Sequence, residues 1–261
     1  MIVKNRNILY IATAAISFMA AACLPLPSID DGTDTGTEDG VTNKEPSHLL
    51  AHYSFENSFN DVSGMGKNGV GLNDPSFITD TPSGKGFALK LNGFKDQYVN
   101  IPYQFFYDDK NYSISLWLKD FSIGVIISAS DSRQTHYDFP KLMSTDNSKF
   151  QFFTKQDNSG GDYTDEFSLD FTSIQSNDWH HIVVTCEEFG EHDVICRLYV
   201  DGQLIDSIES DWNESSCHGM FIGGTKNGEY PNAISAKYDE VRIYGCTLSA
   251  SEVYYLYNNC L

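Results

Sequence analysis

The sequence has few basic residues and few long apolar runs. It holds 17 Lys and Arg against 36 Asp and Glu, which gives a net charge of −19 at pH 7. A strongly acidic surface repels phosphates, so no nucleic acid partner is expected. One long apolar run exists, near the N-terminus, and this excludes a multi-span membrane protein. The strong helix formers Ala, Leu, Glu and Lys do not dominate, which excludes a helical bundle.

Several motifs of common chemistries are also missing from the sequence. No Cys-x-x-Cys pair is present, so neither a zinc site nor a thioredoxin-like site is expected. There is no Gly-x-Ser-x-Gly nucleophile elbow and no Gly-rich phosphate loop before a helix. His180 and His181 are adjacent in a predicted strand and would point to opposite faces, so they are not expected to ligate one ion.

The first 22 residues have the organisation of a signal peptide. Lys4 and Arg6 form a positive start, and the apolar run 8–22 is too short for a stable spanning helix. The run ends in three alanines followed by Cys23, and small residues directly before a Cys resemble the bacterial lipoprotein signal. This predicts a signal peptide over residues 1–22 and a lipid-anchored protein of the outer membrane or surface of a Gram-negative bacterium, with Cys23 as the lipidated residue. An ordinary secretory signal is the alternative.

Residues 23–46 are predicted to be a disordered tether. Positions 24–46 contain Pro, Gly, Thr and six acidic residues but no aromatic residue. Such a segment cannot bury enough apolar surface to fold.

Residues 47–261 are predicted to form one all-β domain. Short runs rich in Val, Ile, Phe and Tyr recur between turn residues, at the spacing of sandwich strands. In the run 112–119, Tyr, Ile and Leu alternate with Ser, Trp and Lys, which is typical of a half-buried strand. Asp201-Gly202 predicts a tight hairpin, and Ser249 with Glu252 predicts a capping box at the start of a helix. The predicted strands are 49–55, 86–91, 98–101, 112–119, 125–129, 150–154, 167–171, 181–186, 196–200, 203–208, 220–223 and 234–244.

Four segments, in order, resemble a laminin G-like domain of the concanavalin A-like lectin/glucanase superfamily. They are HYSFENSFNDVSGMGKNGVG (52–71), GFALKLNG…YVNIP…YSISLWLK (86–119), WHHIVVTC…RLYVDGQL (179–204) and IGG…YDEVRIYGCTLSASEV (222–253). The resemblance implies a two-sheet antiparallel jelly-roll sandwich with one short C-terminal helix. Members of this superfamily mostly bind carbohydrate or protein, and some branches are enzymes, so the fold alone does not decide the function.

The sequence also contains the acidic spacing of the glucanase branch. Glu209, Asp211 and Glu214 repeat that spacing, and alternation on a strand would place such carboxylates on one face. Here the motif follows the LYVDG segment instead of preceding it, and its spacers are Ser, Trp and Asn. We therefore interpret it as a loop and expect no catalytic residues; a glycoside hydrolase is the less favoured alternative.

A bound structural calcium ion is a better hypothesis for the acidic residues than a catalytic site. Calcium takes six to eight oxygen ligands. Glu56, Asn60 and Asp61 offer oxygens in the turn after the first strand, and Asp239 offers another on the last strand. The resemblance implies a structural calcium in this region. The alternative is that Asn60 and Asp61 only form Asx-type turns.

Aromatic residues in polar segments are candidates for stacking on sugar rings. We expect Trp212, Tyr137, Tyr163 and Tyr230 to contact a ligand, although each ring could instead cover an edge of the sandwich. The expected function is therefore a surface-anchored, non-catalytic carbohydrate-binding or adhesion module, whose partner is a carbohydrate or a surface protein. A protein–protein component of a cell-surface assembly is the alternative.

The cysteines allow disulfides if the protein is exported. Cys186 and Cys196 lie in consecutive predicted strands and could face each other, whereas Cys246 and Cys260 flank the last helix and could also join. With Cys23 lipidated, five cysteines remain, so at least one stays unpaired within the chain.

Overall fold

The computed structural model describes ten stretches of the chain. They are residues 45–106, 110–131, 140–145, 150–153, 165–167, 174, 178–190, 193–211, 217–225 and 233–259.

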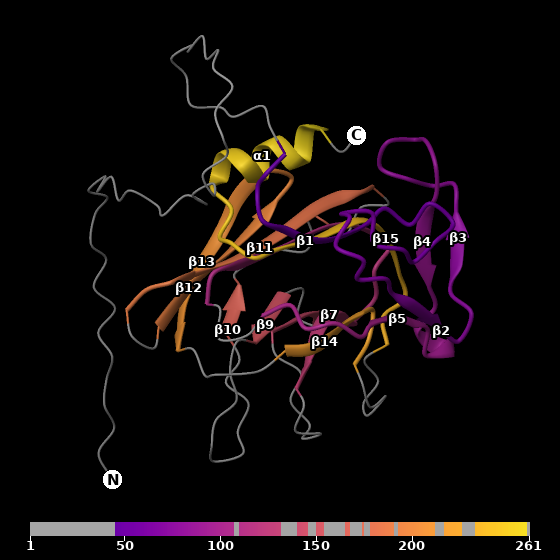
Figure 1. The fold of residues 1–261 in the computed structure, drawn as a ribbon, viewed down its shortest axis with the longest axis horizontal. Helices are drawn as coiled ribbons and strands as arrows, with labels where there is room; N and C mark the ends of the chain where they lie inside the picture. The colour runs from indigo at the N-terminus through magenta and orange to yellow at the C-terminus, as the bar shows by residue number, and fades with distance from the viewer. Residues whose placement is uncertain are drawn as a thin grey trace.

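Within these stretches, the strands form two antiparallel sheets that face each other as a sandwich (Figure 1). One sheet has eight strands in the order β13-β12-β11-β6-β15-β4-β3, with β1 paired to β15; the other has seven, in the order β10-β9-β8-β7-β14-β5-β2. The predicted all-β jelly-roll sandwich is confirmed. The eight-stranded sheet contains β1 (Leu49–Tyr53), β3 (Ser76–Ile78), β4 (Ala88–Leu91), β6 (Tyr112–Lys119), β11 (His180–Glu188), β12 (Asp193–Val200), β13 (Gln203–Asp211) and β15 (Ala236–Tyr244), and the seven-stranded sheet contains β2 (Val70–Leu72), β5 (Tyr98–Ile101), β7 (Gly124–Asp131), β8 (Lys141–Ser144), β9 (Phe150–Phe153), β10 (Asp165–Phe167) and β14 (Cys217–Ile222).

The main hydrophobic core lies between the sheets, and strand alternation supplies it. In β6, Ile114, Leu116 and Leu118 belong to this core, as the alternating pattern predicts. The hairpin prediction is also confirmed, because Asp201 (φ 50°) and Gly202 (φ 77°) both adopt positive φ between β12 and β13.

Part of the outer face of the eight-stranded sheet is covered, which the pattern of β6 did not predict. Trp117 is buried and stacks on Tyr257 of α1 (Ala250–Asn259), with ring centroids 5.8 Å apart. The expectation of a half-buried strand is therefore wrong for β6: its two faces are both covered, because α1 packs over this part of the sheet (Figure 1). The predicted capping box is present, since Ser249 N donates to Glu252 Oε2 (2.8 Å) and Glu252 N donates to Ser249 Oγ (3.3 Å).

Three short strands were not expected from the sequence: β2, β3 and β8. Each has three or four residues, so the alternation that signals a strand has hardly begun before the strand ends.

Candidate functional site

Three connections between the two sheets meet at one end of the sandwich. The chain leaves β4 for β5 through a 3-10 turn, η1 (Gly93–Lys95), and leaves β6 for β7 through residues 120–123. It enters β15 through residues 233–235. Leu91 pairs with Ala236 and Lys119 pairs with Lys237, so the ends of β4 and β6 lie beside the start of β15.

These connections enclose a pocket of about 440 Å³. Its lining combines exposed apolar side chains with hydroxyl groups and one carboxylate. The lining residues are Gly93, Phe94, Asp96, Ser122, Ile123, Ala233 and Ser235.

Short hydrogen bonds fix the three connections to one another. Ser122 N donates to the Ser235 carbonyl (2.8 Å), and Ser235 N donates to Ser122 Oγ (3.0 Å). Gly93 N donates to Ser235 Oγ (3.0 Å). A Cβ at Gly93 would lie 2.1 Å from the Ala233 carbonyl oxygen, so this close approach requires glycine. The pocket is therefore preformed by backbone and serine hydroxyl contacts between the three connections.

Phe94 stands at the rim of this pocket with 98% of its surface exposed. Its backbone is held in place, because Phe94 N donates to Asn92 Oδ1 (3.0 Å). The buried Gln97 side chain fixes the flanking chain: its Oε1 accepts from Asn92 N (2.9 Å) and its Nε2 donates to the Asp74 carbonyl (2.7 Å). The Phe94 ring is exposed to water on a backbone that is held in place and contributes nothing to the core, which makes it a candidate ligand platform.

The aromatic residues that we expected to contact a ligand, Trp212, Tyr137, Tyr163 and Tyr230, all lie outside the described residues. Sequence reasoning missed Phe94, which lies in the short segment Asn-Gly-Phe-Lys-Asp between two predicted strands. A single aromatic residue among turn-forming residues is the signal that could have found it.

The expected calcium ligands fall into two groups. Asp61 accepts three backbone N–H groups, from His52 (3.0 Å), Ser63 (2.9 Å) and Lys67 (2.9 Å), and so organises the turn after β1. Asn60 is exposed in the same turn, where its backbone N–H donates to Ser58 Oγ (3.0 Å). The contact between Asp61 and Ser63 is the Asx-type turn that the sequence offered as the alternative, whereas the contact of Asn60 uses its backbone N–H and a serine hydroxyl.

Asp239 and Glu56 form the second group, at the outer side of β15. Asp239 is 5% exposed, and burial, with the nearby charges of Glu240 and Glu56, raises the pKa of Asp239 to about 8. Glu56 Oε1 accepts from Phe87 N (3.2 Å), and glycine at position 86 leaves room for that carboxylate. Among the described residues, no group of three or more His, Cys, Asp or Glu side chains is arranged to hold a metal ion. Because both oxygens of Asp61 already accept from backbone N–H groups, Glu56 and Asp239 are the better candidates for holding a cation.

The acidic glucanase-like spacing lies at a sheet edge. Glu209 is exposed on β13 and pairs with Ile195 of β12, while β13 continues to Asp211. Our interpretation of the whole segment as a loop is therefore wrong as far as Asp211. Glu214 lies outside the described residues.

The histidines and cysteines occupy structural positions. His180 Nδ1 lies 2.8 Å from Asp201 Oδ2, and His181 Nε2 lies 2.8 Å from Ser115 Oγ, so the two rings have separate partners. Cys186 and Cys196 pair directly across β11 and β12 as buried thiols with their Sγ atoms 2.8 Å apart. Cys246 is disulfide-bonded; Cys260, its expected partner, lies outside the described residues.

Architecture and sequence together define the class of protein: a two-sheet antiparallel sandwich of the lectin type. The Laminin_G_3 family model, described as the concanavalin A-like lectin/glucanases superfamily, matches residues 92–254. The chain belongs to this superfamily, and the resemblance found in its sequence is confirmed. No curated protein matches the chain.

Several solved structures share the fold. The binding domain of botulinum neurotoxin DC in complex with SialylT has a TM-score of 0.62 and 18% identity, over 82% of this chain and 51% of that chain. The same domain in complex with rat synaptotagmin II has a TM-score of 0.62 and 17% identity, over 82% and 52%. The binding domain of Paraclostridial Mosquitocidal Protein 1 has a TM-score of 0.57 and 19% identity, over 82% and 52%. This chain spans about half the length of these structures, and at such identities the likeness shows the fold alone.

No helix in the described ranges is long and apolar enough to cross a bilayer.

Proposed function

We propose that the protein is a lipid-anchored surface lipoprotein whose sandwich domain is a non-catalytic carbohydrate-binding or adhesion module. One observation carries the proposal: the preformed pocket with Phe94 at its rim. Ligand pockets usually combine apolar surface with a few fixed polar groups, and this pocket has both. The neurotoxin domain in complex with SialylT shows that a sandwich of this fold can belong to a glycan-binding protein.

The arrangement of the chain suits presentation from a membrane. The tether would join the domain at Glu45, which accepts from Tyr244 Oη (3.0 Å) at the end of β15. The pocket lies at the start of the same strand, beside Ala236. The nine residues of β15 are separated by eight intervals of about 3.3 Å, so the two sites lie roughly 26 Å apart. A lipid on Cys23 would therefore leave the pocket on the far side of the domain from the tether.

The test is binding of the detergent-solubilised full-length protein to a broad glycan panel, with bound polysaccharides checked for new reducing ends. Saturable binding without breakdown is the expected result. Release of reducing ends would instead favour a glycoside hydrolase, and a panel without any binder would favour a protein partner.

Binding of a protein partner is the second candidate function, and exposed apolar residues at the edge of the eight-stranded sheet support it. In the described part of the chain, β13 is an edge strand and carries the exposed residues Leu204 and Ile205. Exposed apolar side chains on an unpaired edge are a common feature of protein interfaces.

A structural calcium ion beside Glu56 and Asp239 belongs to this proposal. A cation there would neutralise the buried Asp239 carboxylate, which otherwise bears the cost of burial beside two like charges. We expect 1 mM calcium to raise the melting temperature of the wild-type protein relative to chelator at pH 8, and Asp239→Asn to abolish the increase. Asp61→Asn is the control, and calcium should raise its melting temperature as much as it raises that of the wild type. If calcium still raises the melting temperature of Asp239→Asn, Asp239 is not a ligand of the ion.

A further inference from the structure

The residues that line the pocket between the three connections restrict the chemistry of its ligand. Phe94 and Ile123 present apolar surface at the rim, with 98% and 56% of their surfaces exposed. Ser122 and Ser235 add hydroxyl groups, although both hydroxyls also serve in the contacts that join the loops. Asp96 supplies the one carboxylate among the described lining residues. The ligand must therefore offer an apolar face and hydrogen-bond donors together.

A sugar ring has both properties on one small unit. The C–H groups of a pyranose face carry partial positive charge and pack against the negative face of an aromatic ring, while the hydroxyls at its edge donate to a carboxylate. The pocket volume of about 440 Å³ lies at the low end of the range for small-molecule sites, which is roughly 300–1,000 Å³. This size suits the end of a glycan chain better than a long internal segment.

The position of Asp96 makes the polar contact predictable. Asp96 ends η1 in the left-handed conformation (φ 49°), and Asn73 Nδ2 donates to its carbonyl oxygen (2.7 Å). The backbone that carries Phe94 and Asp96 is thus fixed, and the two residues lie two positions apart on one short turn. Such preorganisation lowers the entropy that binding must overcome.

The charge of the lining residues determines which sugars the pocket can accept. Asp96 is the acidic residue of the lining, and no Lys or Arg lines the pocket among the described residues; Lys95 is exposed on the same turn but is not part of the lining. The whole chain carries −19. A carboxylated sugar would meet a like charge in the pocket and a repulsive field around it.

Building on the proposed function, we infer that the pocket binds the neutral terminal sugar of a glycan, a hexose or N-acetylhexosamine, stacked on Phe94 with its hydroxyls on Asp96. Sugars that bear a carboxylate, such as sialic acid, are excluded. This specificity differs from that suggested by the neurotoxin domain in complex with SialylT.

The experiment compares neutral-ended glycans with the same glycans capped by sialic acid, by calorimetry on the full-length protein in detergent. We expect the neutral-ended forms to bind at least tenfold more tightly than the capped forms. Phe94→Ala should weaken their binding at least tenfold. Because Phe94 is almost wholly exposed, this variant should keep the wild-type melting temperature.

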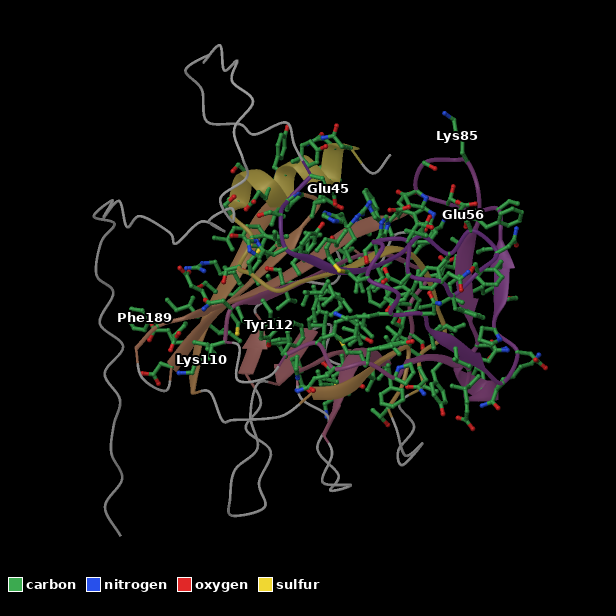
Figure 2. The ribbon with its side chains drawn as sticks, viewed as in Figure 1. Glu45, Glu56, Lys85, Lys110, Tyr112 and Phe189 are labelled. Carbon is green, nitrogen blue, oxygen red and sulfur yellow. The ribbon has the colours of Figure 1, made fainter. Side chains whose placement is uncertain are left out.

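Phe189→Ala is the matched control. Phe189 is a 55% exposed phenylalanine after β11. Figure 2 shows it at the left of the molecule, whereas Figure 1, in the same view, shows β2 and β5 at the right. This variant should bind as the wild type does. Asp96→Asn retains a residue that tolerates positive φ and removes the charge, so it should narrow the difference between neutral and capped glycans.

The outcomes separate the inference from the proposed function. Glycan binding that Phe94→Ala and Phe189→Ala leave equally unchanged would place the site elsewhere and overturn the inference, while the binding function would stand. Tighter binding of sialylated glycans would overturn the ligand class alone. Binding of no glycan by any form would overturn both.

Discussion

His181 is a buried polar residue on the outer face of the eight-stranded sheet. It lies 5.2 Å from the Trp117 ring and 6.2 Å from the Tyr257 ring, between centroids. Burial, with the charge of Arg242, lowers the pKa of His181 to about 3. The imidazole is therefore neutral in the folded protein at pH values where an unfolded chain would protonate it.

This difference predicts a pH-dependent contribution to stability. The folded pKa is lower than the unfolded value of 6.5, so the contribution is complete above pH 6.5 and is lost as the pH falls toward 3. One proton corresponds to at most about 1.4 kcal/mol per pH unit. We expect His181→Gln to be less stable than wild type at pH 7 and the gap to narrow toward pH 4. Urea unfolding at pH 7, 5.5 and 4.5 measures it; a gap that stays constant would contradict the assignment.

Cys186 and Cys196 are placed to form a disulfide when an oxidant is supplied. Exchange with oxidised glutathione would join the two sulfurs and release two reduced glutathione molecules. We expect both thiols to become resistant to alkylation in denaturant after such treatment, as mass spectrometry of the peptides would show. Cys246, which is already disulfide-bonded, is the internal control. Full alkylation of both cysteines after oxidation would show that the strand pairing does not allow the bond.

At the scale of elements, α1 converts an ordinary sheet face into a second core. Val253 and Leu256 are fully buried in a cluster with Val183, Tyr199 and Tyr244. The helix has ten residues, too few to be stable in water by itself, so its cap and its packing must act together.

The cap of α1 can be tested directly. Ser249→Ala removes the acceptor for Glu252 N and should lower the free energy of unfolding by about 1 kcal/mol. Chemical denaturation with a shared slope would measure the change. Ser251→Ala, two positions later, is the matched control, because the Ser251 hydroxyl lies against Ser249 Oγ and not against a backbone N–H of the first helical turn. Equal losses in the two variants would contradict a specific capping role.

At the scale of the whole molecule, the two ends of β15 have different roles. Glu45, where the proposed tether would join the domain, lies beside Tyr244, and the pocket lies beside Ala236. The sandwich would therefore act as a rigid spacer between an anchor and a ligand.

The proposed lipid anchor on Cys23 leads to a prediction about the membrane association of the whole protein. We expect Cys23→Ser to move the protein from the membrane fraction to the soluble fraction and to abolish incorporation of labelled fatty acid. The isolated variant should bind glycans as the wild type does, since Cys23 lies far from the pocket in sequence and precedes the tether. Unchanged membrane association and labelling of the variant would favour a different mode of attachment.

The sequence alone determined the architecture of this protein to a large extent. Alternation in β6, the Asp201-Gly202 turn and the Ser249–Glu252 cap depend on neighbouring residues, so local patterns were enough to predict them. The four family-like segments then indicated the superfamily, which the match over residues 92–254 shows.

Only the tertiary structure decided where the pocket lies and which part of the sheet α1 covers. Phe94, Ile123 and Ser235 come from three distant connections, and nothing in the composition of any one of them predicts the other two. Trp117 is buried because α1, more than 130 positions later, packs over it. Asp61 and Asp239 likewise looked alike as acidic residues, but Asp61 accepts from backbone amides of β1 and of the turn after it, whereas Asp239 is buried beside like charges. Such properties depend on contacts between residues far apart in sequence, which alternation and spacing do not encode.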